Sequence, residues 1–220
     1  MLEQLFDLFA PHLCTKCHKE ADLLCLECAQ FLPFVSPACY KCTNPADDRG
    51  ICDGCISLSP FAAMYAATSY GPDVKEVVRR LKYERAQAAV YPMARLMSHR
   101  LPSFPSSTVV TCAPTATRRV RIRGYDQAEL LAKALADTLR LPYRSMLMRV
   151  GQTRQVGSSR EQRQKQLQHA FSAKVKMPSS ISQVILIDDV LTTGATLEAA
   201  AATLKQHGVE KVIAVVFAKA

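Results

Sequence analysis

The chain has 220 residues, of which 49% are hydrophobic and 21% charged, with 8 glycines and 12 prolines. This length suits one sizeable domain, or a medium domain with a small additional module, and excludes a large multidomain protein. The composition is that of a globular protein with a buried core, which excludes a disordered or fibrous chain. No apolar run reaches the roughly 20 residues of a membrane helix, and acids stand near the start where a signal peptide is basic. We therefore expect a cytoplasmic protein without a membrane span.

The net charge of +9 is unevenly distributed along the chain. Residues 1–60 carry −4, residues 61–220 carry +13, and residues 118–176 alone carry +10. Positive charge concentrated in this way attracts phosphate-rich ligands, either nucleotides or nucleic acids, although a solvated basic surface has the same charge. The candidate contacts to DNA or phosphate at the start of this segment are Arg118, Arg119, Arg121 and Arg123.

Eight of the nine cysteines form four CxxC pairs. A CxxC turn presents two thiolates to one ion and tetrahedral zinc takes two such turns, so four pairs predict two zinc sites. Disulfides and an iron–sulfur cluster are the alternatives, but disulfides do not suit a reducing compartment. The expected zinc ligands are Cys14, Cys17, Cys25, Cys28, Cys39, Cys42, Cys52 and Cys55.

The sequence leaves open which CxxC turns share an ion. Sequential pairing gives two small ribbons in tandem, and an interleaved arrangement uses the same ligands. Four thiolates leave no open coordination position, which favours a structural role over a catalytic one. Because little apolar sequence lies between the turns, zinc is expected to supply much of the folding energy of residues 12–56. The acidic charge of this region favours packing or protein docking over direct binding of nucleic acid.

Beyond the cysteines, the hydrophobic pattern predicts helices and strands in alternation. The expected elements are a helix over 73–83, a strand over 109–112, a helix over 125–140, a strand over 184–187, a helix over 197–206 and a strand over 211–217. Strand, helix and strand in succession form a βαβ unit. We therefore predict an α/β fold, a parallel sheet of about five strands flanked by helices, over 58–220, with a small double zinc ribbon over 1–57.

Four further side chains receive structural assignments. Arg79, Arg80 and Lys82 lie opposite the apolar face of the helix over 73–83, which favours a solvated surface over a ligand site. Cys112 has no CxxC partner and stands in an apolar strand, so we expect a buried free thiol.

The most informative segment follows the strand over 184–187. It contains Asp188 and Asp189 and then a loop before the next helix, formed by Thr192, Thr193, Gly194, Ala195 and Thr196. Such a loop offers backbone N–H groups, hydroxyls and the positive end of the helix dipole to one anion. Carboxylates at the carboxyl end of a strand suit sugar hydroxyls or a magnesium ion. The segment therefore predicts a sugar-phosphate site.

Residues 184–196, VILIDDVLTTGAT, resemble the phosphoribosyl pyrophosphate (PRPP) signature of type I phosphoribosyltransferases. The resemblance implies that Asp188 and Asp189 face the ribose hydroxyls, that the loop over 192–196 holds the 5′-phosphate, and that Mg²⁺ accompanies PRPP. It also implies that Ala113, Pro114 and Thr115 face the pyrophosphate. Rossmann and Walker sites are not indicated, because GxGxxG and GxxxxGK are both missing from the sequence.

Nearly the whole chain is similar in motif order to the ComF/GntX-like competence proteins. The motifs that carry this resemblance are the four CxxC pairs, Tyr70-Gly71-Pro72 to Lys82-Tyr83, Arg123-Gly124-Tyr125-Asp126-Gln127, Gln155, Arg163 and Ala170-Phe171. The resemblance implies a double zinc ribbon fused to a phosphoribosyltransferase-like domain, in a family associated with uptake of single-stranded DNA during natural transformation. PRPP or a nucleotide, single-stranded DNA, and a competence helicase with DNA-processing proteins are the partners it implies. This chain departs from the family pattern at the 113–115 turn, at Asp126 and at Gln166.

Three functions remain open. The first is a PRPP- or nucleotide-binding competence factor, the second an active phosphoribosyltransferase in nucleotide salvage or related metabolism, and the third a zinc-dependent regulatory adaptor. No His or Glu near the loop over 192–196 is assigned as the group that activates an acceptor, so enzymatic activity is left open. Residues 152–168 are either a lid that closes over PRPP or a surface linker.

Overall fold

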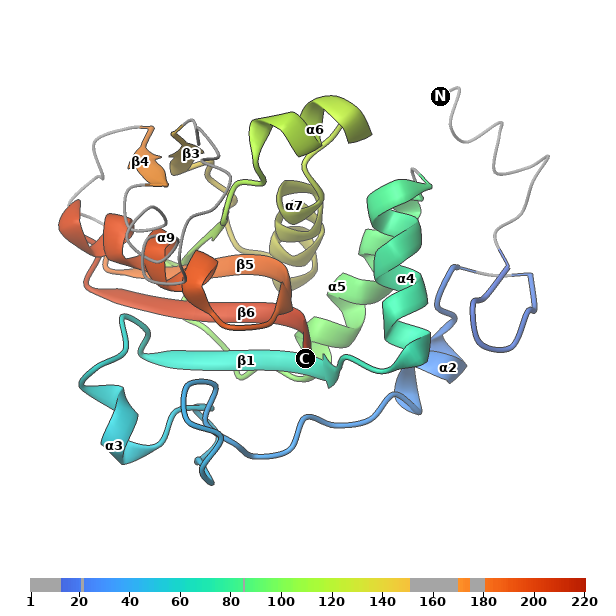
Figure 1. Cartoon of the computed structure of the whole chain (residues 1–220), viewed down its shortest axis with the longest axis horizontal. Coiled ribbons are helices and arrows are strands. Elements are labelled where there is room, and N and C mark those ends of the chain that lie inside the picture. Colours follow the sequence, from blue (N-terminus) through green and yellow to red (C-terminus); the bar gives the residue numbers. More distant parts are fainter. Residues whose placement is uncertain (1–12, 21, 85, 151–169, 175–180) are drawn as a thin grey trace, which may run out of the picture.

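A computed structural model of the chain describes residues 13–20, 22–84, 86–150, 170–174 and 181–220. Its main sheet consists of β1 (Ala63–Ser69), β2 (Val109–Cys112), β5 (Gln183–Leu191) and β6 (Lys211–Lys219). The strands are parallel and lie in the order β1-β6-β5-β2 (Figure 1). The two central strands, β5 and β6, are buried over most of their length because helices cover both faces of the sheet.

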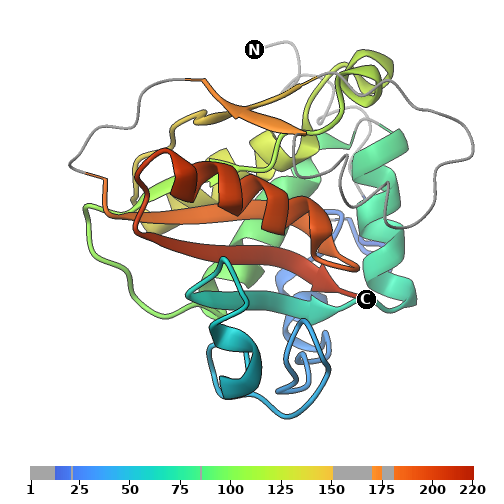
Figure 2. The same cartoon turned by 60° about the vertical axis from the view of Figure 1, so that its left-hand side comes forward.

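One face of the sheet is covered by α5 (Val90–His99) and α7 (Gln127–Leu139), and the other by α9 (Ala195–Gln206) (Figure 2). A short 3₁₀ helix, η1 (Gln87–Ala89), leads into α5. The strands point toward α4 (Pro72–Tyr83), which stands across their carboxyl ends (Figure 1). This placement brings α4 next to the loops where α/β proteins bind their ligands.

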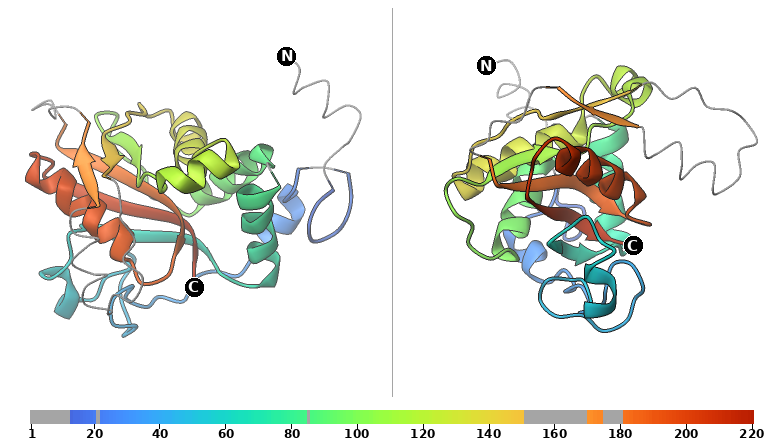
Figure 3. Two further views of the ribbon diagram at one scale, coloured as in Figure 1. Left: turned by 45° about the horizontal axis from the view of Figure 1, so that its top comes forward. Right: turned by 90° about the vertical axis from the view of Figure 1, so that its left-hand side faces the viewer.

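Smaller elements complete the fold. β3 (Leu147–Arg149) and β4 (Phe171–Ala173) form an antiparallel pair that lies over α9 (Figure 3). α6 (Thr117–Arg123) follows β2, and the short helices α2 (Leu26–Gln30) and α3 (Asp53–Ile56) belong to the cysteine-rich region. In the described part of the chain, no helix has both the length and the apolar character needed to cross a membrane.

The cysteine-rich region packs along the edge of the sheet that β1 forms. The backbone N–H of Met64 donates to the Arg49 carbonyl oxygen at 2.8 Å, and the Thr68 hydroxyl donates to the Pro33 carbonyl oxygen at 2.9 Å. The hydrophobic core on the α5 and α7 face includes Cys14, whereas the core on the α9 face includes Cys39. The domain division at residue 57 stays a prediction. Residues on both sides of this division contribute to each of the two hydrophobic cores.

The predicted α/β architecture is confirmed, with differences at the ends of elements. In the described residues the parallel sheet has four strands rather than about five, and a single bridge from Val110 to Tyr143 continues it beyond β2. Pro142 has no N–H to donate, which limits a strand at that place. β5 does not stop at the two aspartates but runs to Leu191, because its backbone pairs with β6 up to Lys219.

Candidate functional site

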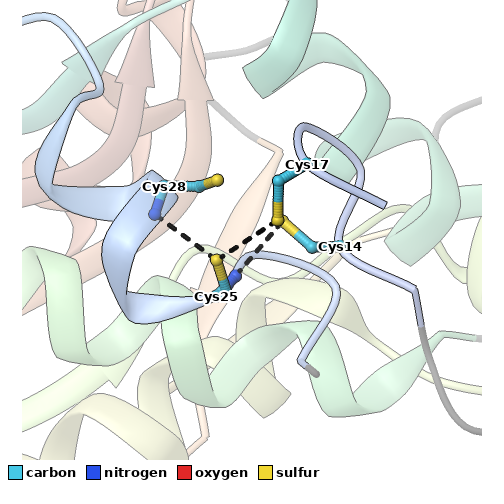
Figure 4. Close-up of side chains that lie close together, drawn as sticks. All are labelled: Cys14, Cys17, Cys25 and Cys28. Atoms are coloured by element: carbon cyan, nitrogen blue, oxygen red, sulfur yellow. Dashed lines mark hydrogen bonds between the residues drawn. The ribbon is translucent and has the colours of Figure 1, made fainter. Parts of the chain in front are cut away.

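The four CxxC turns pair sequentially into two groups, which settles the question that the sequence left open. The first group is Cys14, Cys17, Cys25 and Cys28 (Figure 4), and the second is Cys39, Cys42, Cys52 and Cys55. Within each group the sulfur atoms lie within 4.8 Å of one another. Zn–S bonds of about 2.3 Å in a tetrahedron separate two sulfurs by about 3.8 Å. Sulfurs of Cys17 and Cys25 are 3.8 Å apart and those of Cys42 and Cys52 3.5 Å apart, so both groups fit zinc.

Backbone N–H groups prepare one thiol of each group for metal binding. Burial opposes ionisation of Cys14 and Cys39, but backbone N–H groups directed at their sulfurs outweigh it and lower the pKa of each thiol to about 6. One such donor is the N–H of Cys25, 3.5 Å from the Cys14 sulfur. Zinc would displace the protons of the other thiols on binding.

The two aspartates of the predicted sugar-phosphate site lie near the carboxyl end of β5. Asp189 is only 5% exposed, and its Oδ2 lies 2.7 Å from the Lys82 ammonium at the end of α4. Burial, followed by the adjacent charge of Asp189, raises the pKa of Asp188 to about 8. The two neighbouring carboxyl groups therefore offer oxygen atoms that suit a cation or sugar hydroxyls, while the Lys82 ammonium offsets the charge of Asp189.

Lys82 is a residue that the sequence analysis assigned wrongly. Arg79 and Arg80 do form surface ion pairs with Glu76 and Glu84, as expected for a solvated face. Lys82 instead points to Asp189, because α4 ends over the carboxyl edge of the sheet.

The loop over 192–196 leads into α9 through a left-handed glycine. Gly194 is the N-cap of α9 and has a φ of +79°, a backbone conformation that favours glycine. The first N–H groups of a helix have no partner within it, and glycine has no side chain to occupy them. Thr192 and Thr193 are exposed beside these donors, and the Ala195 N–H lies 3.5 Å from the Thr193 hydroxyl.

The predicted pyrophosphate turn, Ala113 to Thr115, is held in place from two sides. The N–H of Ala113 donates to the Ile187 carbonyl of β5 at 2.9 Å. The N–H and the hydroxyl of Thr115 both donate to the carboxylate of Asp126 at 2.8 Å. Asp126 also accepts hydrogen bonds from the first N–H groups of α7 as its N-cap. An aspartate at this position therefore joins the turn to α7, because both of its oxygens accept.

A basic pocket of about 240 Å³ lies between α4 and α6 and is lined by Lys82, Tyr83, Arg119, Ile122, Arg123 and Tyr125. Arg123 is 8% exposed, and its guanidinium donates to Gln127 and lies 5.2 Å from the centre of the Tyr83 ring. The Tyr125 hydroxyl donates to the Leu81 carbonyl, which joins the segment after α6 to α4 beside the pocket. Of the four predicted arginines, Arg119 and Arg123 thus line this pocket, whereas Arg118 and Arg121 are exposed elsewhere on α6.

Sequence analysis also missed Arg149 and Glu198. Arg149 in β3 is half-buried and donates to the Pro114 carbonyl at 3.4 Å, and burial followed by the charge of Arg119 lowers its pKa. Glu198 in the first turn of α9 accepts from Tyr40 and Lys41 of the second cysteine group. No sequence pattern indicates these long-range contacts. For Glu198, its position two residues after the loop over 192–196 is the one sequence feature that links it to the site. The predictions for Gln166 and for a lid over 152–168 lie outside the described residues.

Comparison with known proteins agrees with the geometry. Residues 126–220 match the phosphoribosyl transferase domain family. The chain is 28% identical over 215 residues to the DNA utilization protein YhgH of Salmonella typhi, an alignment that covers 91% of this chain and 94% of that protein. It is 29% identical over 209 residues to competence protein F of Haemophilus influenzae, covering 91% and 87%, and 25% identical over 203 residues to competence protein ComFC of Bacillus subtilis, covering 86% and 81%.

These relatives match almost the full chain, and the matched domain contains the loop and both aspartates. The two four-cysteine groups lie in the part that precedes this domain. The resemblance predicted from the sequence is therefore confirmed: the protein is ComF-like, with a phosphoribosyltransferase-type domain and two Cys₄ groups.

Proposed function

We propose that this protein binds PRPP with Mg²⁺ at the loop over 192–196 and acts as a cytoplasmic competence factor that handles single-stranded DNA during uptake. The observation that carries the proposal is the left-handed Gly194 at the start of α9, directly after the two aspartates of β5. A phosphate at this loop would meet backbone donors, two exposed threonine hydroxyls and the positive end of the helix.

Each part of PRPP has a counterpart in the chain. The loop binds the 5′-phosphate, and Asp188 and Asp189 accept from the ribose hydroxyls. Mg²⁺, when bound, would neutralise part of the pyrophosphate charge, and carboxylate oxygens are ligands it prefers. The turn over 113–115 faces the pyrophosphate in this proposal, and Arg149, which donates to the Pro114 carbonyl, supplies positive charge there, while Lys82 supplies it beside Asp189.

The basic pocket beside this site is the candidate contact for single-stranded DNA. Arg119 and Arg123 supply charge for the backbone, while Tyr83, 70% exposed, offers a ring on which a base can stack. The two exposed arginines of α6, Arg118 and Arg121, extend the positive surface. The relatives named for DNA utilization and competence support this assignment, as does the local charge of +10.

An active phosphoribosyltransferase is the second candidate. The observation in its favour is the position of the 240 Å³ pocket, which shares Lys82 with the carboxylate pair and so places an acceptor base beside the ribose. Release of pyrophosphate from PRPP in the presence of candidate bases tests this function directly.

Two variants separate the proposed ligands. Asp189→Asn combined with Thr193→Ala should abolish the thermal stabilisation that PRPP and Mg²⁺ give to the wild type, since a ligand of the native state stabilises it by RT ln(1 + [L]/Kd). DNA binding by this variant should keep its salt dependence. Absence of any PRPP stabilisation of the wild type at millimolar ligand would contradict the PRPP assignment.

Replacing Arg118, Arg119 and Arg121 by alanine should have the opposite effect. Binding of a single-stranded oligonucleotide should weaken, and its salt slope should fall by about 0.7 log units for each lost phosphate contact. A control that replaces the exposed Lys75, Lys205 and Lys211 loses the same charge elsewhere. Equal weakening by the control would show that DNA binding follows net charge and not α6.

A further inference from the structure

The second cysteine group is in direct contact with the loop that we assign to phosphate, and the contact runs through Tyr40 and Lys41. These two residues lie between the zinc ligands Cys39 and Cys42, inside one CxxC turn. The first group offers a comparison, because Thr15 and Lys16 occupy the corresponding places in its first turn.

Tyr40 packs against the glycine of the loop. A methyl group added at Gly194 would lie 3.3 Å from two carbons of the Tyr40 ring, which is tighter than ordinary contact. Tyr40 is only 7% exposed, and its ring meets Phe61 edge-on with centroids 5.4 Å apart. The Tyr40 ring therefore packs directly against Gly194 and supports the left-handed turn of the loop.

The polar ends of the same two residues hold the first turn of α9. The Tyr40 hydroxyl donates to Glu198 Oε1 at 2.8 Å, and the Lys41 ammonium lies 3.1 Å from the same oxygen. Glu198 in turn donates its N–H to the Gly194 carbonyl at 2.8 Å and so closes the first turn of the helix. The buried tyrosine contact is the more important one, because exposed ion pairs such as that of Lys41 stabilise little.

The first cysteine group packs elsewhere. The Thr15 hydroxyl donates to the Leu23 carbonyl within the group, and Lys16 forms an ion pair of 3.4 Å with Asp73 at the start of α4. Its core contacts belong to the α5 and α7 face of the sheet, opposite to α9. Loss of metal from this group would therefore leave the contact between Tyr40 and Gly194 unchanged.

We propose that the second Cys₄ group is a metal-dependent support for the phosphate loop, with Tyr40 as the positioning residue that couples zinc binding to PRPP binding. The inference rests on the proposed function, since it needs a phosphate ligand at this loop. Without zinc, the turn over 39–42 loses the ligands that fix it, and Tyr40 is no longer held beneath Gly194. Coupling between two binding sites is reciprocal in binding free energy, so bound PRPP must raise the zinc affinity of the second group, and we expect this as slower zinc release from that group alone.

The experiment follows zinc release from the zinc-loaded full chain with a chromophoric chelator, with and without saturating PRPP and Mg²⁺. We expect two release phases, of which PRPP slows one by about tenfold, a coupling in the usual range. Cys25→Ser, which keeps only the second site, should retain the PRPP-sensitive phase, and Cys52→Ser should retain only the insensitive one. PRPP that slows both phases, or neither, would overturn the proposal.

Variants of Tyr40 distinguish positioning from general stability. Tyr40→Ala should still hold two zinc ions, bind PRPP about tenfold more weakly, and release both ions at rates that PRPP does not change. Tyr40→Phe keeps the ring under Gly194 and should recover most of the affinity and the coupling. Tyr40→Ala with wild-type affinity would refute the role of the ring. If the wild type binds no PRPP, the proposed function fails as well, whereas bound PRPP without an effect on zinc release refutes only the coupling.

Discussion

The two Cys₄ groups have the same ligands and nearly the same spacing, yet they occupy different environments. The first packs into the core beneath α5 and α7, and the second packs into the core beneath α9. Only the second contacts the loop over 192–196 among the described residues, because its CxxC turn contains Tyr40 where the first contains Thr15. The comparison teaches that ligands determine which metal is bound, while the residues between the ligands determine what the metal supports.

Loss of a zinc ligand should have the largest effect. Cys28→Ser and Cys55→Ser should each reduce the zinc content from two ions to one and lower the melting temperature by about 10 °C, because structural zinc supplies several kcal/mol of folding energy. Only Cys55→Ser should weaken PRPP binding in the folded protein. Elemental analysis measures the zinc content, and calorimetry measures the melting temperature and the PRPP affinity. Equal PRPP affinities of the two variants would contradict the different roles that we assign to the two groups.

Gly194→Ala should come next. A side chain at a φ of +79° costs about 1–2 kcal/mol, and its methyl group would press on the Tyr40 ring at 3.3 Å. We expect a small loss of stability and nearly complete loss of PRPP binding in titration calorimetry. Gly208→Ala is the control, since Gly208 also has a positive φ, of +96°, and the added methyl group there meets nothing within 4 Å. Unchanged PRPP affinity in Gly194→Ala would mean that the phosphate binds elsewhere.

Lys82→Ala should have an intermediate effect, at the aspartate pair of β5. It leaves the buried Asp189 without the ammonium 2.7 Å away, which should cost about 1–3 kcal/mol in urea unfolding. Added Mg²⁺ should stabilise this variant more than the wild type, because the carboxylate charge is less neutralised. Lys75→Ala on the exposed side of α4 should change neither quantity.

The smallest effect concerns Cys112, the one cysteine outside both groups. It is 4% exposed, and burial raises the pKa of its thiol to about 12, so the thiol stays neutral at pH 8. In zinc-loaded protein, mass spectrometry should find Cys112 unmodified by iodoacetamide, and removal of zinc should expose the eight ligands first. Rapid alkylation of Cys112 in the folded protein would show that β2 is less buried than described.

Short-range patterns predicted most of the fold and the two Cys₄ groups. CxxC spacing, β-branched runs and the Thr/Gly loop are local features, and each appears in the structure where the sequence indicated it. Contacts between distant segments were not predictable in this way. Lys82 meets Asp189 because of where α4 crosses the sheet, and Tyr40 meets Glu198 across 158 positions of sequence. Neither residue type signals such a partner, so both escaped the sequence analysis.

Hydrogen exchange of the zinc-loaded chain, with and without PRPP and Mg²⁺, tests the central claim most directly. PRPP bound at the loop should slow exchange of the backbone N–H groups over 192–198 and, through Tyr40, over 39–42. Exchange over 14–28, in the first cysteine group, should stay unchanged. Slower exchange in α6 alone, or no change over 192–198, would contradict the account.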